Sequence, residues 1–198
     1  MLKIKFNIEK FKRSLPAIKY ILLGLVLIFL IGILGIAKKQ KPAPEPTPAP
    51  VVQTVPKYTD FHLEIPSLNI NAPIIADVDG NDKDAYFKAL EGGVAHFQGT
   101  AKPGEGSNIF IFGHSSYYWW AAGDYKEIFK NLEDVKEGDE IDVWYQEKEY
   151  KYKVSKTEVV DPTDVDVLKP TPSEQLTLMT CVPVGTDKQR LIVIAKPI

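Results

Sequence analysis

One cysteine, one arginine and one histidine are the residues that could do chemistry together. Cys181 is the only cysteine of the 198 residues and ends the run Leu-Thr-Leu-Met-Thr-Cys. Arg190 follows nine residues later and is the only arginine after residue 37, where the other cationic side chains are lysines. Arginine offers a planar pair of donors that holds an oxygen or a carboxylate, whereas lysine offers a point charge. A buried structural cysteine with a surface arginine is the alternative.

The histidine of this set is His114. The apolar run Ile109–Phe112 predicts a strand buried on both faces, and the run ends at Gly113-His114. A glycine at a strand end permits a close backbone approach, so the histidine would stand on a rigid support. A histidine that only caps the strand is the alternative. We expect His96 to be structural, and His62 has no comparable setting.

Two predicted strands position the cysteine and the arginine. The first strand ends at Cys181, and alternation gives it one face of Thr177, Met179 and Cys181 and another of Leu176, Leu178 and Thr180. The second is Arg190–Ala195. The short loop between them favours antiparallel pairing, which would bring Cys181 and Arg190 to one end of the sheet.

A thiol nucleophile, a histidine acid/base and a donor for a carbonyl oxygen together form an acyl-transfer site. Sequence spacing does not place His114 beside the other two residues. Its membership of the site is inferred from chemistry alone.

The rest of the globular region is predicted to be mainly β with two short helices. Two edge strands are expected within Phe61–Ile75, and a hairpin from Glu140–Tyr145 and Tyr150–Val154. One helix is expected at Asp84–Leu90, N-capped by Asp84, and another at Asp124–Leu132. Many short strands without a βαβ rhythm favour an antiparallel barrel.

Aromatic residues crowd the loop after His114, in the sequence Tyr-Tyr-Trp-Trp. These tryptophans could line a groove, but we expect Trp119 and Trp120 to pack on the core.

Residues 15–37 predict a transmembrane anchor, because the eighteen residues from Tyr20 to Ala37 carry no charge. Six basic residues precede the span and three follow it, which puts the tail of residues 1–14 in the cytoplasm and the remainder outside. A cleaved signal peptide ending at Gly35–Ala37 is the alternative, but its apolar core would exceed the usual length of roughly 7–15 residues.

Residues 38–57 contain six prolines and predict a linker before the domain of residues 58–198. At about 3.1 Å per residue in polyproline II, this spacer would reach roughly 60 Å; a disordered stalk is the alternative. The net charge of −2 combines +5 in residues 1–37 with −7 in the remainder, so the acidic domain argues against a nucleic-acid partner. No cofactor and no metal are expected, since Asp161, Asp164 and Asp166 follow no recognisable ligand pattern.

The motif Thr-Leu-Met-Thr-Cys, with an arginine on the next strand and an upstream strand ending in Gly-His, resembles the sortase family. The segments HLEIPSLNINAPI, ALEGGVAHFQGTAKPGEGSN, IFGHSS, GDEI and VVDPTDVDVL resemble sortase domains in the same order. The resemblance covers about residues 60–198.

The resemblance implies a closed eight-stranded β-barrel and a cysteine transpeptidase on a bacterial cell membrane. Cys181 would be the nucleophile, His114 the general acid/base and Arg190 the donor to substrate and oxyanion, with Thr180 shaping the substrate site. Such enzymes cleave an LPxTG-like sorting signal between Thr and Gly. They pass the acyl group through a thioester to an amine of peptidoglycan or of a pilin. The loop Asp161–Ser173 would recognise the signal, and the likeness leans to sortase classes D and E.

Two other functions remain open from the sequence. An L,D-transpeptidase would also be a cell-wall cysteine enzyme, but that family has a histidine and a glycine before its cysteine, where this chain has Met179-Thr180. A non-enzymatic anchored surface domain would leave Cys181 inert to thiol reagents. Since nothing follows Ile198, we expect no second anchor.

Overall fold

The computed structural model describes residues 23–25, 56–120 and 122–198. The predicted anchor of residues 15–37 therefore lies outside the described residues, except that residues 23–25 are helical. No helix in these described ranges is both long enough and apolar enough to cross a membrane. The linker of residues 38–57 also lies outside, apart from its last two residues.

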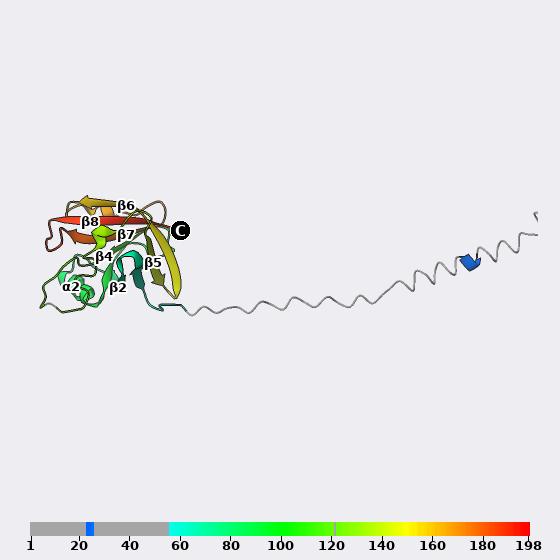
Figure 1. The fold of residues 1–198 in the computed structure, drawn as a ribbon, viewed down its shortest axis with the longest axis horizontal. Helices are drawn as coiled ribbons and strands as arrows, with labels where there is room; N and C mark the ends of the chain where they lie inside the picture. The colour runs from blue at the N-terminus through cyan, green and yellow to red at the C-terminus, as the bar shows by residue number, and fades with distance from the viewer. Residues whose placement is uncertain (1–22, 26–55, 121) are drawn as a thin grey trace, which may run out of the picture. The chain divides into compact units, whose positions relative to one another are not determined.

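Eight strands close into one barrel (Figure 1). Their order around the barrel is β1-β2-β3-β4-β7-β8-β6-β5, and β5 pairs back with β1. The strands are β1 (His62–Ile65), β2 (Ile70–Val78), β3 (Val94–Phe97), β4 (Asn108–Phe112), β5 (Glu140–Tyr145), β6 (Lys148–Val160), β7 (Gln175–Val182) and β8 (Gln189–Pro197). The predicted mainly-β closed barrel of eight strands is confirmed.

The prediction of an antiparallel barrel is wrong for two of the eight strand pairs. β2 pairs parallel with β3, and β4 pairs parallel with β7. Parallel neighbours need a crossover connection, and helix α2 (Lys83–Gly92) supplies it between β2 and β3. One βαβ unit was therefore missed in the sequence. The second parallel pair is the one that matters for the site below.

Helix α2 confirms the predicted helix with a different cap. The carboxylate of Asp82, not Asp84, accepts hydrogen bonds from the backbone amides of Asp84 and Ala85 at 2.9 and 3.1 Å. The helix ends at Gly92, with Gly93 as its C-cap.

The predicted helix at Asp124–Leu132 is wrong. This stretch forms turns, and a 3₁₀ helix η2 follows only at Leu132–Asp134. The backbone amide of Phe129 donates to the carbonyl of His114 at 2.9 Å, so it is not available for a helical bond. The apolar spacing still serves the core, because Phe129 and Leu132 are buried there.

Two hydrophobic cores support the barrel. The larger one fills the interior, where Leu63, Ile111, Leu178 and Val193 are fully buried. The smaller one lies where α2 and the 3₁₀ helix η3 (Val165–Leu168) cover outward-facing residues such as Phe110 and Phe112 of β4. Strand β4 is therefore buried on both faces, as its continuous apolar run predicted.

The prediction that Trp119 and Trp120 pack on the core is wrong. Their side chains are 84% and 65% exposed.

Candidate active site

Cys181 and Arg190 face each other across the antiparallel pair β7–β8, whose register sets them directly opposite. Opposite residues of an antiparallel pair project from the same face of the sheet, with Cβ atoms about 4.5–5.5 Å apart. The predicted pairing is confirmed, and it puts the thiol beside the guanidinium at one end of the two strands.

The parallel pair β4–β7 brings His114 to the same place. Phe112 pairs with Met179, and one residue later the amide of Gly113 donates to the carbonyl of Met179 at 3.1 Å. The hydroxyl of Thr180 donates to the carbonyl of Gly113 at 2.9 Å. The register continued by one more residue sets His114 level with Cys181. The strand pairing thus brings His114 near Cys181 and Arg190, which sequence spacing alone did not predict.

Tyr86 of α2 independently links the three residues. Its ring centroid lies 6.4 Å from that of His114. Burial raises the pKa of Tyr86 to about 12, with a further increase from the nearby charge of Cys181 and an opposing effect of Arg190. The phenol therefore lies near the His114 ring and within electrostatic range of Cys181 and Arg190. Tyr86 was not predicted as a site residue. Only the apolar face of α2 indicated that its side chain turns toward the barrel.

The Cys181 thiol is half-buried, and burial raises its pKa above 9.0. Arg190 lowers this pKa, and Asp187 raises it further. Burial also lowers the pKa of His114 below 6.5. Arg190 thus favours the thiolate, but desolvation outweighs its effect on the pKa of Cys181. Near pH 7 the dominant form pairs a neutral thiol with a neutral imidazole.

The Arg190 side chain is held by its own loop. Its Nη1 donates to the carbonyls of Asp187 and Gln189 at 3.0 and 3.1 Å. These two bonds fix the guanidinium beside the end of β7.

Thr180 lies on the face of β7 opposite to Cys181 and is 1% exposed. Its bond to Gly113 ties the cysteine strand to the histidine segment. The contact with substrate predicted for Thr180 stays a prediction, whereas the tether is what the structure shows.

A second tether, missed in the sequence, joins the two loops around the site. The hydroxyl of Ser116 accepts a hydrogen bond from the amide of Gly185 at 2.9 Å. Ser116 follows His114 by two residues, and Gly185 lies in the loop between Cys181 and Arg190. The bond therefore holds the histidine segment against the loop that joins the other two residues.

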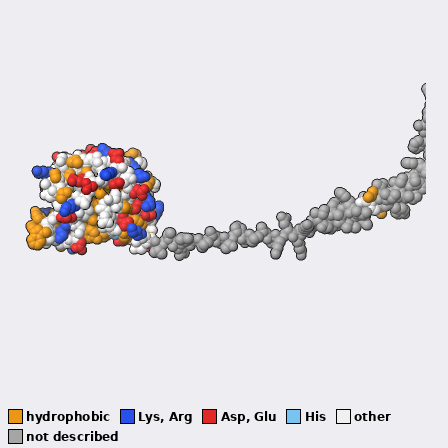
Figure 2. Space-filling view, in the orientation of Figure 1, with side chains coloured by type: hydrophobic (Ala, Val, Ile, Leu, Met, Phe, Trp, Pro, Cys, Tyr) orange, Lys and Arg blue, Asp and Glu red, His pale blue; other side chains and the backbone are white. Residues whose placement is uncertain are grey.

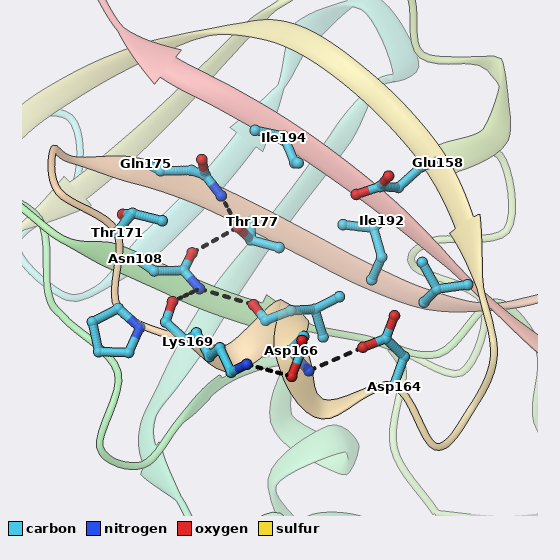
Figure 3. A pocket seen from close by; sticks show the side chains of 13 residues that line it. Asn108, Glu158, Asp164, Asp166, Lys169, Thr171, Gln175, Thr177, Ile192 and Ile194 are labelled. Carbon is cyan, nitrogen blue, oxygen red and sulfur yellow. Dashed lines mark hydrogen bonds and ion pairs between the residues drawn. The ribbon is translucent and has the colours of Figure 1, made fainter.

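A cavity of about 300 Å³ lies beside β7 and β8 (Figure 3). Its wall on the barrel side includes Thr177, Ile192 and Ile194, and the loop between β6 and β7 closes it with Asp164, Asp166 and Lys169. Thr177 shares a face of β7 with Cys181 and stands four residues before it, which is about 13 Å along a strand.

The polar groups of this cavity are bonded to one another. The side-chain amide of Gln175 donates to Thr177 at 3.0 Å, and the Thr177 hydroxyl donates to Asn108 at 2.7 Å. Figure 3 draws both bonds as dashed lines. The side-chain amide Nδ2 of Asn108 donates in turn to the carbonyls of Val167 and Lys169 at 2.9 and 3.2 Å. This chain of bonds holds the loop over the barrel.

The three loop aspartates are engaged within their own loop. Asp161 accepts from the amide and hydroxyl of Thr163 at 2.9 and 2.6 Å, Asp164 accepts from the amide of Asp166 at 3.0 Å, and Asp166 pairs with Lys169 at 2.7 Å. Within the part of the chain that the structure describes, no group of three or more His, Cys, Asp or Glu side chains is placed to bind a metal ion.

The closed barrel with a cysteine, a histidine and an arginine near the end of one strand defines a β-barrel with a candidate cysteine active site. Comparison with known proteins gives the family. The Sortase domain matches residues 63–198, so the chain belongs to the sortase family. Sortase D of Bacillus subtilis (strain 168) is 29% identical over 138 residues, covering 68% of this chain and 61% of the relative. Sortase SrtE1 of Streptomyces coelicolor is 30% identical over 146 residues, covering 68% of this chain and 39% of that protein.

Solved structures agree with the sequence comparisons. Sortase A from Corynebacterium diphtheriae is 35% identical with a TM-score of 0.58, covering 71% of this chain and 61% of that one. A Clostridium perfringens Sortase D5 transpeptidase is 28% identical with a TM-score of 0.57, covering 71% and 79%. The chain thus spans about three fifths or less of the two full-length relatives, and about three fifths to four fifths of the two structures.

Proposed function

We propose that this protein is a membrane-anchored cysteine transpeptidase. The observation that carries the proposal is the register that sets Cys181 opposite Arg190, with His114 on the adjoining segment. In the proposed site, nucleophile, acid/base and oxygen-holding donor meet near the end of β7, and Thr177, four residues before Cys181 on the same strand, lines a cavity beside β7 and β8.

The proposed first step forms a thioester. The Cys181 thiolate attacks the carbonyl carbon of the signal threonine, and Arg190 stabilises the oxyanion that develops on the carbonyl oxygen. As the C–N bond breaks, His114 donates a proton to the departing glycine nitrogen. The products are an acyl group on the Cys181 sulfur and a free amine on the released peptide.

The second step reverses the proton transfer. His114 takes a proton from the acceptor amine, whose nitrogen attacks the thioester carbon. The C–S bond then breaks, and the sulfur leaves as thiolate while a new amide bond forms. The reactive form therefore needs a thiolate and an imidazolium together. The opposite pKa shifts of the two groups make this form a minor one at neutral pH.

The cavity beside β7 and β8 suits an extended peptide. The distance of about 13 Å from Thr177 to Cys181 corresponds to four extended residues, the length of the Leu-Pro-x-Thr part of a signal. Ile192 and Ile194 offer an apolar wall to the leading residues. The engaged loop of residues 161–173 forms the opposite wall.

The anchor, the orientation and the acceptor belong to the same proposal. The uncharged span within residues 15–37 and the basic tail before it support an N-terminus in the cytoplasm and a catalytic domain outside. The acceptor would be an amine of peptidoglycan or of a pilin. The relatives carry the names of sortase classes A, C, D and E, so class D or E stays a prediction.

Incubation with a library of LPxTG-like peptides, followed by mass spectrometry, tests this function. We expect an acyl adduct on Cys181 that hydroxylamine removes, and an amide product when a small amine is added. Labelling of Cys181 by a thiol reagent without any peptide adduct would indicate a different acyl substrate. A thiol that remains unlabelled at neutral pH would support the non-enzymatic surface domain.

A further inference from the structure

Three neighbouring aromatic side chains leave most of their surface exposed on the loop after His114. Tyr118, Trp119 and Trp120 are 59%, 84% and 65% exposed, and we call them the aromatic tip. In the described chain no other large hydrophobic side chain is as exposed as Trp119. Figure 2 shows hydrophobic side chains gathered at the end of the domain where α2 lies in Figure 1. A cluster of this kind marks a contact surface.

The aromatic tip is continuous with the active site. The ring of Tyr117 stacks on His114 with centroids 4.6 Å apart, and it lies 5.3 Å from the ring of Tyr118. Tyr118 stacks on Trp120 at 4.7 Å, and Trp120 meets Trp119 edge-on at 5.5 Å. A row of rings therefore leads from the catalytic histidine to the surface.

The backbone of the tip is also held in place. The Nζ of Lys126 donates to the carbonyl of Trp119 at 3.3 Å. The exposed rings are thus presented by a tethered loop.

We propose that the aromatic tip inserts into the interfacial layer of the bilayer that carries the predicted anchor. Tryptophan and tyrosine combine an apolar ring with one polar group, and they are enriched where one end is apolar and the other is wet. The six residues from Ser115 to Trp120 carry no charge, so insertion desolvates no ion. This inference rests on the proposed anchoring of the chain.

The linker is long enough to permit the contact. The domain of residues 58–198, which has 141 residues, is expected to measure roughly 40 Å across, from a radius of gyration of about 14 to 15 Å. The predicted linker of twenty residues, which would reach roughly 60 Å as polyproline II, would let any face of such a domain touch the bilayer. The tether also keeps the local concentration of the tip near the membrane high, so modest insertion energy suffices.

The shape of the tip favours a membrane over a small ligand. Ligands bind in concave sites, and the cavity of about 120 Å³ near this loop is lined by His114 and Tyr117 but not by Trp119 or Trp120. The two tryptophans are instead exposed on the surface. Contact with the bilayer would hold the side of the domain that bears His114 close to the membrane surface, where anchored substrates arrive.

Fluorescence of the full-length chain in lipid nanodiscs tests the proposal. The chain has three tryptophans, and Trp144 is 4% exposed in the barrel. Discs are compared that contain phosphatidylcholine with or without bromine on its acyl chains, because bromine quenches tryptophan in contact with lipid. The double variant Trp119→Ala/Trp120→Ala, which keeps Trp144, is measured in the same discs. Both replaced side chains are exposed, so this variant should fold normally.

In the unmodified chain, we expect brominated lipid to quench most of the emission of Trp119 and Trp120. The emission of the double variant, which comes from Trp144, should not change. Co-elution of the chain with the discs reports the anchor separately. If the chain co-elutes and bromine changes nothing, the membrane contact is refuted. Protection of these tryptophans from aqueous iodide in that case would assign the tip to a protein partner, such as a second copy. Failure to co-elute would refute the anchor, and the proposal with it.

Discussion

Two histidines, one in strand β3 and one just after the neighbouring strand β4, have very different surroundings. His96 lies in β3 and is fully buried, and its two ring nitrogens bond to the carbonyl of Ala101 at 3.0 Å and the amide of Asp77 at 3.4 Å. His114 follows β4, and the described contacts of its ring are the aromatic faces and edges of Tyr86, Phe87 and Tyr117. Burial lowers the pKa of both histidines.

The two histidine rings are held in different ways, which leaves their nitrogens with different partners. The neutral ring of His96 donates through Nε2 to Ala101 and accepts through Nδ1 from Asp77, so protonation of Nδ1 would break its bond to the amide of Asp77 in β2. The ring of His114 is positioned by stacking, which fixes its plane and leaves its nitrogens to the reacting groups. In the proposed mechanism, the histidine that moves protons is thus held by its ring faces, whereas His96 is held by its nitrogens.

Replacing each histidine by glutamine should separate the two roles most strongly. His114→Gln should lower the rate of thioester formation by about 10²- to 10⁴-fold at unchanged stability, because the acid/base is lost. His96→Gln should leave the rate near normal and lower the free energy of unfolding by about 1–3 kcal/mol, because buried partners lose their bonds. Peptide turnover and chemical denaturation measure the two effects. Equal rate losses in both variants would erase the distinction.

Arg190→Lys should come next in size, with a rate loss of about 10²- to 10³-fold, since a point charge replaces the planar donor pair. The loss should appear in kcat, because the oxyanion exists only in the transition state. Lys188→Arg, in the same loop, is the matched control and should behave as the unmodified chain. Full activity of Arg190→Lys would remove the donor role.

Gly113→Ala should disturb the support of His114. A Cβ at this position would lie 2.8 Å from the Phe129 ring and 3.1 Å from Val94. Relieving this overlap should cost about 1–3 kcal/mol of stability and shift the histidine segment. Gly92→Ala, whose nearest contact would be 3.6 Å, is the control and should be neutral. Thermal unfolding and turnover are the measurements, and normal values for both with Gly113→Ala would show that the site needs no close packing there.

The stability of the domain should fall as the pH drops below 6.5. The folded-state pKa values of His96 and His114 both lie below the ordinary histidine value of 6.5. Below pH 6.5 the unfolded chain therefore binds protons that the folded chain does not. The contribution is complete above pH 6.5 and is lost as the pH falls through the folded pKa values. His96→Gln and His114→Gln should each flatten the denaturation profile between pH 7 and 4. A profile that neither variant changes would mean that burial does not set these pKa values.

Ser116→Ala should have the smallest effect. Loss of its bond to Gly185 should cost about 1 kcal/mol and loosen the two loops around the site. Turnover should fall a few-fold with KM unchanged, and Ser116→Thr should restore it. An unchanged rate in Ser116→Ala would show that the tether does not position the catalytic groups.

The sequence predicted the elements that depend on local pattern. Alternation located β7, a continuous apolar run located β8, and the short loop between them correctly paired Cys181 with Arg190. The apolar run of β4 was correctly read as buried on both faces. These signals act over a few residues, so they are visible without a structure.

Long-range and competing contacts were beyond the sequence. The parallel pairing of β4 with β7 joins residues nearly seventy positions apart, and no local pattern encodes it. The amide of Phe129 bonds to His114 instead of forming the expected helix. Trp119 and Trp120 look like core residues by type, and only the fold reveals that they face solvent.

The central claim is that His114, and not His96, shares a site with Cys181. The lone cysteine can be labelled with methanethiosulfonate reagents that attach a fixed positive or negative group, and NMR can then follow the three histidines through a pH titration. A negative group should raise the pKa of His114 and a positive group should lower it, while His96 and His62 stay unchanged. A pKa of His114 that is the same with both labels would contradict the account.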